Sequence, residues 1–310
     1  MSNLERIGNY EFERRYEEID KNNLQYDVSK QYFDVSMSLH SFIYEDPFLK
    51  VARRLVIHGN MDYGGKLGPS HLTRDERIDD AKKNMDRFLK DGKVDPKDVR
   101  IMRNNPDRND PKLYVVNIDE QEVGDNHIVK DVGDFVYTYN PDIVLAIQPA
   151  DCPTMIASGE NPKGRIYMMA HYGWQGSAND FVGQTSSVWD SLDIERSSLS
   201  IYLTPGAQAE SFHYHNYPVD PRKKFTHVDT SELFVNVRNT GENPDKPWEF
   251  SIDTPFFVYH QILKLHDIKP SQIFCDTNNT SSAESGYSSN TRSINNSEDN
   301  TRDLVIAKLY

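Results

Sequence analysis

Cysteine is scarce in this sequence, and the two thiols present form no structural pattern. The 310 residues contain only Cys152 and Cys275, which excludes the disulfide-rich class of small secreted domains and gives no zinc-finger spacing. We expect no structural disulfide. Each thiol is therefore considered singly, either as a small buried side chain or as a reactive group.

Excess positive charge and long apolar runs are also lacking. Lys and Arg total 35 against 48 Asp and Glu, which gives a formal net charge of -13 at pH 7. Because such a surface repels phosphate backbones and anionic lipids, we expect neither a nucleic acid nor a membrane as partner. No apolar run approaches the roughly 20 residues of a membrane-spanning helix, and the first residues lack the pattern of a secretory signal. We expect a cytoplasmic protein, and the sequence leaves its oligomeric state open.

The residues that are present suffice for a large core built from strands and helices, since 37% are hydrophobic. Helical spacing of apolar residues predicts a helix over 73–89, and an Asp-Thr-Pro start predicts another over 253–267. A third helix is predicted to begin at Ser177. The predicted strands are 55–59, 99–103, 112–118, 134–139, 142–148, 199–203 and 303–310. This order indicates an α/β (α+β) fold with a central mixed β-sheet flanked by helices.

The chain is predicted to form one domain with an N-terminal extension. Residues 1–54 are rich in charge and show no clean hydrophobic period, so we expect an extension packed on the core, and residues 55–310 as a single domain. Asn, Ser and Thr dominate residues 278–301, but an apolar strand follows them. The segment is therefore predicted to be a long internal loop, and loops of this kind are usually functional or mobile.

One hairpin brings a cysteine and a histidine together. Cys152 precedes an apolar run, His171 ends the next one, and the turn-forming residues 158–164 lie between the runs. In an antiparallel pair with a loop centred near residue 161, Cys152 lies roughly opposite His171, where a thiol and an imidazole can share a proton or a metal. The helix predicted at Ser177 would add backbone N–H groups for an anion or an oxyanion. The alternative is a buried thiol beside an ordinarily hydrogen-bonded histidine.

Two motifs carry a family resemblance. GDFVYTYNPDIVLAIQPADCPTMIAS and GRIYMMAHYGWQG resemble the YfiH or laccase-domain family, described as multicopper polyphenol oxidoreductase-like. Weaker matches, among them GNMDYGGKLGP and FCDTNNT, extend the resemblance over residues 55–310.

The resemblance implies an α/β fold shared with cysteine hydrolases such as the cytotoxic necrotizing factor catalytic domain. It also implies zinc bound through His, Cys and His, with purine nucleoside phosphorolysis, adenosine deamination, polyphenol oxidation or peptidoglycan-precursor hydrolysis as activities. Carried over by position, Cys152 and His171 match two of the three metal ligands. Trp174, Gln175, Arg292 and Arg302 are the candidates for substrate binding.

The chain departs from the family pattern at the third ligand and at several cations. Arg103 or Asn104 stands where the family has its first metal-binding histidine, and the possible substitutes are His58, His71, His213 and His215. Gln175 replaces one family arginine, Asp62 another, and Asn290 or Thr291 a third. Since these cations would recognise phosphate, their loss argues against phosphorolysis in particular.

Three functions are compatible with this pattern. The first is a laccase-domain enzyme that acts on a purine nucleoside at Cys152 and His171, with zinc as the implied cofactor and a nucleoside as partner. The second is a metal-independent amidase or deamidase, with Cys152 as nucleophile and His171 as base. The third is a non-catalytic ligand-binding relative that has lost the metal-site histidine. Cys275 is predicted to be a buried thiol that ends a strand.

Overall fold

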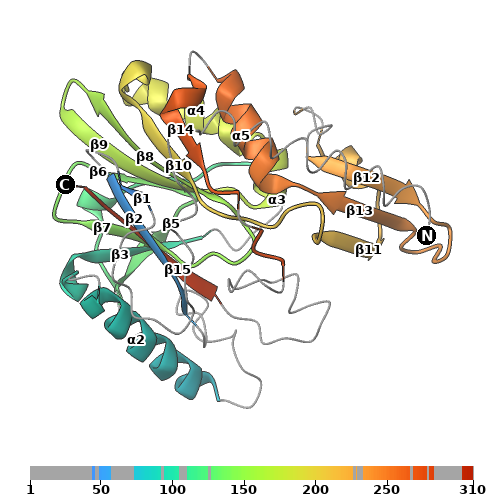
Figure 1. Cartoon of the computed structure of the whole chain (residues 1–310), viewed down its shortest axis with the longest axis horizontal. Helices are drawn as coiled ribbons and strands as arrows, with labels where there is room; N and C mark the ends of the chain where they lie inside the picture. Colours follow the sequence, from blue (N-terminus) through green and yellow to red (C-terminus); the bar gives the residue numbers. More distant parts are fainter. Residues whose placement is uncertain are drawn as a thin grey trace.

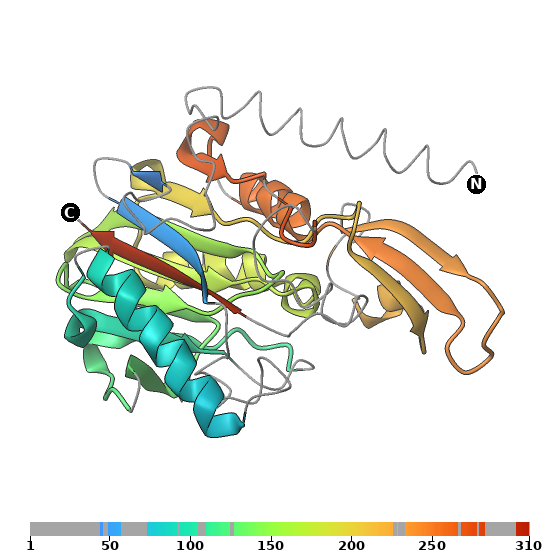
Figure 2. The same cartoon turned by 60° about the horizontal axis from the view of Figure 1, so that its bottom comes forward.

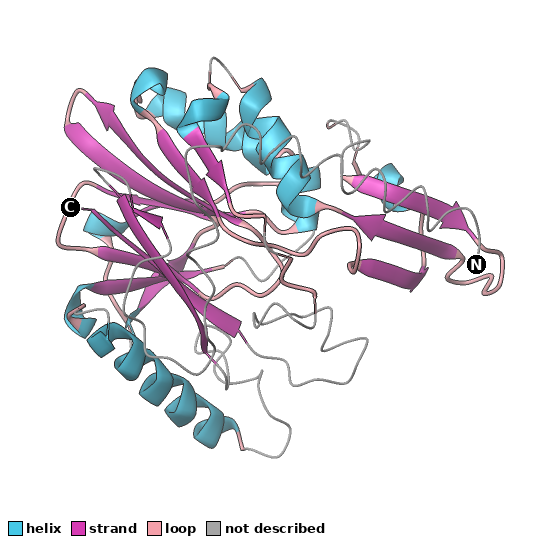
Figure 3. Cartoon of the chain, viewed as in Figure 1, coloured by secondary structure: helices cyan, strands magenta, loops and turns pink. Residues whose placement is uncertain are grey.

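The computed structural model is built from four layers, with two β-sheets inside and helices on both outer faces (Figure 1 and Figure 3). The structure describes residues 44–45, 49–56, 73–91, 94–104, 110–124, 127–225, 228, 233–265, 268–277, 279–282 and 302–309.

The first inner sheet has six strands in the order β1-β2-β15-β7-β3-β5. Its strands are β1 (Tyr44–Glu45), β2 (Leu49–Val56), β3 (Val99–Arg103), β5 (Ile128–Val132), β7 (Val144–Ile147) and β15 (Arg302–Leu309). Strands β7, β3 and β5 run parallel, and the remaining pairs are antiparallel. The sheet thus joins the two ends of the described chain, because β15 pairs with β2 along its whole length.

The second inner sheet has six strands in the order β14-β10-β8-β9-β6-β4. Its strands are β4 (Val115–Asn117), β6 (Phe135–Thr138), β8 (Thr154–Asn161), β9 (Gly164–His171), β10 (Ser200–Leu203) and β14 (Ile273–Cys275). The β8–β9 hairpin lies at its centre and is antiparallel, whereas the outer pairs β14–β10 and β4–β6 are parallel. The expected mixed α/β fold is confirmed, and its β layer consists of two stacked sheets.

Side chains alternate between the two faces of each strand, so successive residues pack against different layers. On β7, Leu145 and Ile147 pack between the two sheets, while Val144 and Ala146 pack toward the first outer helix. On β9, Tyr167 lies between the sheets, and its neighbours face the other outer helices. Both sheets are therefore buried on two faces, which explains their nearly continuous apolar runs.

The outer helices begin where local capping signals place them. They are α2 (Arg74–Asp91), α3 (Trp174–Ala178), α4 (Phe181–Ser191) and α5 (Thr254–Lys264). Thr73 and Glu76 form a reciprocal capping box at the start of α2, with Thr73 N donating to Glu76 Oε2 at 2.7 Å. Asp253 Oδ1 accepts from Phe256 N at 3.1 Å and caps α5. Both predicted helices are confirmed.

The predicted helix start at Ser177 is wrong. Ser177 lies inside α3, which begins at Trp174, and the next helix begins only after Asp180. Asp180 adopts the left-handed conformation, with φ of 60°, and its carboxylate accepts from Gly183 N at 3.2 Å. The chain therefore turns between two short helices instead of continuing one long helix.

A smaller antiparallel sheet of three strands projects from this body (Figure 2). It has the order β11-β13-β12, with β11 (His213–Tyr217), β12 (Phe234–Asn239) and β13 (Trp248–Ile252). We call it the arm. One face of the arm packs on α3 through aromatic rings, and the other carries polar side chains.

The N-terminal strand differs from its prediction. The strand expected over 55–59 is β2, which begins at Leu49 and ends at Val56. Residues 49–54 therefore belong to the first sheet, whereas 57–59 lie outside the described residues. The division of the chain at residue 54 stays a prediction. Within the described part, no helix combines the length and the apolar character needed to cross a membrane.

Candidate active site at the ends of β8 and β9

Cys152 lies near His171, as expected, but the pairing of the two strands differs from the predicted one. Thr154, the first residue of β8, is the partner of His171, the last residue of β9. The hairpin turns tightly at Pro162 and Lys163, with Gly164 at φ of 118°, and this shifts the pairing by two residues from the prediction. Cys152 therefore lies across from Gly173, just beyond the paired strands.

Gly173 is the point at which the thiol and the imidazole meet. A Cβ atom at this position would lie 3.4 Å from Cys152 Sγ and 3.6 Å from His171 Cε1. Both groups therefore border the same small space, which the missing side chain leaves open. His171 is buried, whereas Cys152 is partly exposed.

Backbone hydrogen bonds hold the segment that carries Cys152. Ala207 N donates to Asp151 O at 2.8 Å, and Tyr172 N donates to Pro153 O at 3.0 Å. The Asp151 carboxylate accepts from the Thr280 hydroxyl at 3.1 Å. Cys152 is thus fixed from both sides by separate parts of the chain, as a preorganised site requires.

Two buried polar side chains lie close to His171 along the backbone. The Asp134 carbonyl accepts from His171 N at 2.8 Å, and the preceding residue donates from Gly133 N to Arg103 O at 2.8 Å. The end of β3 therefore adjoins the end of β9, and Asn104 is the residue that follows β3. Asn104 is 7% exposed, and its Oδ1 has no hydrogen-bond partner among the described residues. The Thr154 hydroxyl is likewise buried without one. Such atoms are costly unless a water or a ligand satisfies them.

Trp174 joins the site to the arm. Its ring lies against four rings of the arm and against Phe225, with centroid distances of 5.7 to 6.4 Å. Only 9% of Trp174 is exposed. Its ring therefore packs against the arm, and its predicted role in substrate binding stays a prediction.

Tyr214 is a site neighbour that the sequence did not indicate. Its hydroxyl accepts a hydrogen bond from Trp174 Nε1 at 3.2 Å. Burial raises the pKa of Tyr214 above its ordinary value. The phenol is therefore protonated at neutral pH. Because 40 positions separate Tyr214 from Trp174, no local pattern could have found it.

The other predicted substrate-binding residues are spread over the molecule. Gln175 lies in the first turn of α3 and is half-buried. Arg302 is the first residue of β15, paired with Val56 in the sheet opposite the Cys152 hairpin. Arg292 lies outside the described residues. The roles of all three stay predictions.

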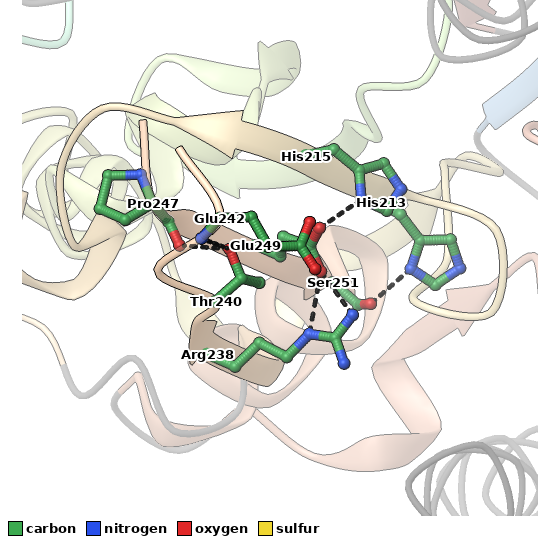
Figure 4. A network of polar contacts seen from close by, with 8 residues as sticks. All are labelled: His213, His215, Arg238, Thr240, Glu242, Pro247, Glu249 and Ser251. Atoms are coloured by element: carbon green, nitrogen blue, oxygen red, sulfur yellow. Dashed lines mark hydrogen bonds and ion pairs between the residues drawn. The ribbon is translucent and has the colours of Figure 1, made fainter. Parts of the chain in front are cut away.

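The histidines considered as a third metal ligand do not supply one in the described structure. His213 and His215 lie on the polar face of the arm, where His213 Nδ1 is 2.5 Å from Ser251 Oγ and His215 Nδ1 is 3.2 Å from Glu249 Oε1 (Figure 4). Tyr214, between them, points to the opposite face. His58 and His71 lie outside the described residues.

The described donor set does not fit the implied zinc site. Zinc takes at least three protein ligands, and Cys152 with His171 supplies two. No group of three or more His, Cys, Asp or Glu side chains in the described part could hold a metal ion. We therefore assign no reaction step to a metal. Cys275 is buried at the end of β14, as predicted.

The fold consists of two stacked mixed sheets with helices on the outer faces. A thiol and an imidazole lie near each other at the end of one hairpin. The chain is therefore an α/β protein with a candidate Cys/His site. The family model for multi-copper polyphenol oxidoreductase laccase matches residues 70–297. The chain belongs to this family, which confirms the resemblance.

Sequence relatives with a named activity match only part of the chain. A purine nucleoside phosphorylase of Rickettsia prowazekii (strain Madrid E) is 32% identical over 174 residues, which cover 54% of this chain and 65% of the relative. A purine nucleoside phosphorylase of Rickettsia conorii (strain ATCC VR-613 / Malish 7) is 30% identical over 124 residues, covering 39% and 45%. The chain therefore spans less than two thirds of the length of either relative.

Solved structures share the fold. Hypothetical protein YfiH of Bacillus licheniformis superposes with a TM-score of 0.62 at 15% identity, covering 84% of this chain and 93% of that one. YlmD of Geobacillus stearothermophilus gives a TM-score of 0.59 at 16% identity, covering 87% and 99%. At these identities the likeness concerns the fold alone.

Proposed function

We propose that this chain is an enzyme acting on purine nucleosides at the Cys152 and His171 site. The observation that carries the proposal is the meeting of the thiol and the imidazole over Gly173, in a chain whose family relatives include purine nucleoside phosphorylases. A nucleophile or water held there would have a proton acceptor in His171.

The electrostatics of the site favour water over phosphate as the second reactant. Asp151 precedes Cys152 in the chain, and a nearby negative charge would disfavour a second anion. Gln175 also provides no positive charge where the family has arginine. In hydrolysis, the N-glycosidic bond breaks, a water oxygen bonds to the sugar carbon, and the water proton passes through His171 to the departing base.

A metal-independent Cys/His amidase or deamidase is the second candidate, favoured by the two-ligand donor set. Cys152 Sγ would attack an acyl carbon, and the C–N bond would break as His171 delivers the thiol proton to the leaving amine. Water would then release the acid and restore the thiol. A ligand-binding protein without turnover is the third candidate.

The test is a nucleoside assay with matched cysteine variants. Adenosine, inosine and guanosine are incubated with and without inorganic phosphate, and free base, ribose, ribose 1-phosphate and inosine are separated by chromatography. We expect product from the wild type and from Cys275→Ala, the matched control, and a loss of at least about 100-fold in Cys152→Ala and His171→Ala.

The outcomes separate the three candidates. Each protein is assayed after chelation and after zinc addition, with the bound metal measured by mass spectrometry. If product forms only with inorganic phosphate, the reaction is phosphorolysis and not hydrolysis. Ammonia release from amides without nucleoside turnover would favour the amidase, and saturable nucleoside binding that survives Cys152→Ala without product would favour the non-catalytic relative.

A further inference from the structure

A row of buried polar side chains crosses the second sheet at the end of β9. Its neighbouring members lie on adjacent strands: Thr154 is the register partner of His171, His171 N donates to Asp134 O at 2.8 Å, and Thr204 N donates to Thr154 O at 3.0 Å. Each member is at most 4% exposed. We call this set the polar row, and in strand order it consists of Asp276, Thr204, Thr154, His171 and Asp134.

Thr154 and His171 face each other at close range in the polar row. Both backbone groups of Thr154 bond to Thr204, with Thr154 N donating to Thr204 Oγ1 at 2.9 Å, while His171 N bonds on the side away from Thr154. The two residues therefore form an antiparallel pair of the non-hydrogen-bonded type, whose Cβ atoms lie about 4.5–5.5 Å apart on one face. Ile156 and Met169, the next residues on that face, belong to the apolar core between the sheets. The hydroxyl and the imidazole are thus aimed into the end of this core.

The position of the Thr154 hydroxyl distinguishes it from other buried hydroxyls. It has no hydrogen-bond partner among the described residues, but the same is true of Ser158 on the same strand. Only Thr154 lies opposite His171, whose Cε1 borders the open space at Gly173 together with Cys152 Sγ. A water molecule held there would contact the hydroxyl, a ring nitrogen of His171 and the reactant in that space, and about three partners is usual for a buried water.

We propose that Thr154 and His171 together hold a water molecule, and that this water is the reactant in hydrolysis. The Thr154 hydroxyl donates to the water oxygen, and the water donates one proton to a ring nitrogen of His171, which leaves a lone pair on the oxygen for attack. As the oxygen bonds to the sugar carbon, the N-glycosidic bond breaks, and His171 takes the water proton and passes it to the departing base. The inference rests on the proposed function for the identity of the ligand.

The first experiment detects the water itself and needs no substrate. Crystal structures of the wild type, Thr154→Val and Ser158→Ala are determined at a resolution that shows ordered waters. We expect a water about 2.7–3.2 Å from both Thr154 Oγ and a His171 ring nitrogen in the wild type and in Ser158→Ala. We expect none at that position in Thr154→Val, where a methyl group replaces the hydroxyl and the branched shape suited to a strand is kept. A wild-type structure without this water would overturn the proposal.

The second experiment measures nucleoside turnover, with Ser158→Ala as the matched control. The Ser158 hydroxyl is also buried without a described partner, but Ser158 lies opposite Tyr167 in the hairpin. We expect Thr154→Val to lower kcat at least about tenfold and to change KM less than about twofold, because positioning of the reacting water is lost. Thr154→Ser, which keeps a hydroxyl, should recover most of this rate, and Ser158→Ala should stay within about twofold of the wild type. Circular dichroism and urea midpoints establish that the variants fold.

The outcomes distinguish this inference from the proposed function. If the wild type turns over no nucleoside, the proposed function fails, and the crystal structures still decide whether Thr154 and His171 hold a water. If turnover requires inorganic phosphate, or if Thr154→Val keeps the wild-type kcat, a water at Thr154 is not the reactant and the proposal is refuted.

Discussion

Gly173→Ala separates the chemistry of the site from the stability of the fold. The added methyl would lie 3.4 Å from Cys152 Sγ and 3.6 Å from His171 Cε1, which are ordinary contact distances, so no atom has to move. Gly173 has φ of -67° and ψ of 156°, a conformation open to alanine. The methyl nevertheless fills the space that a reacting atom would share with both groups.

The expected magnitudes follow from this geometry. Replacing glycine by alanine where the backbone allows it stabilises by about 0.4–1 kcal/mol, and alanine at a helix N-cap costs about the same. The free energy of unfolding should therefore change by less than about 1 kcal/mol. Turnover should fall about 100-fold, because reacting atoms tolerate only small displacements.

Urea unfolding and nucleoside turnover measured on the same preparations test this expectation. Gly124→Ala is the control, since its added Cβ would meet Ile128 O at 3.4 Å and lies away from the hairpin. Full activity in Gly173→Ala would show that the space between thiol and imidazole is not where the reaction takes place. A loss of stability of several kcal/mol would show that the backbone argument is mistaken.

Three further predictions concern packing, metal binding and pH. Gly206→Ala should lower the free energy of unfolding by about 1–3 kcal/mol in urea melts, because its Cβ would lie 2.7 Å from Pro255 Cγ; an unchanged midpoint would contradict this. Asn104→His should raise bound zinc toward one ion per chain by mass spectrometry, since it adds an imidazole at the buried strand end; wild-type zinc content would count against it. Glu249→Gln should flatten the loss of stability in acid, because the Arg238 hydrogen bond lowers the pKa of Glu249. That contribution is present above the ordinary glutamate pKa of about 4.3 and disappears as pH falls through the lower folded value, so parallel pH profiles of unfolding would refute it.

Local signals predicted the elements that local contacts build. The helices α2 and α5 are specified by their caps, and the β8–β9 hairpin by two apolar runs around a turn. The register was missed by two residues because the turn closes at Gly164, whose positive φ cannot be read from spacing alone. The break before α4 was missed for the same kind of reason, since Asp180 caps that helix from a left-handed conformation.

Contacts between distant segments could not be predicted. Apolar runs buried on both faces look alike whether one sheet or two are present, so the sequence does not show that two sheets are stacked. Family motifs indicated Cys152 and His171, and the structure brings both to Gly173. Tyr214 and Thr280 reach the site from far along the chain, through contacts with Trp174 and Asp151.

The site residues stand at the end of β9, just before β8 and just after β3, where the ladder of paired strands stops. A side chain at such a position can be exchanged, and the chemistry of the site changed, without rebuilding the architecture. Descendants of one ancestral scaffold can thus diverge in catalysis while their backbones remain superimposable.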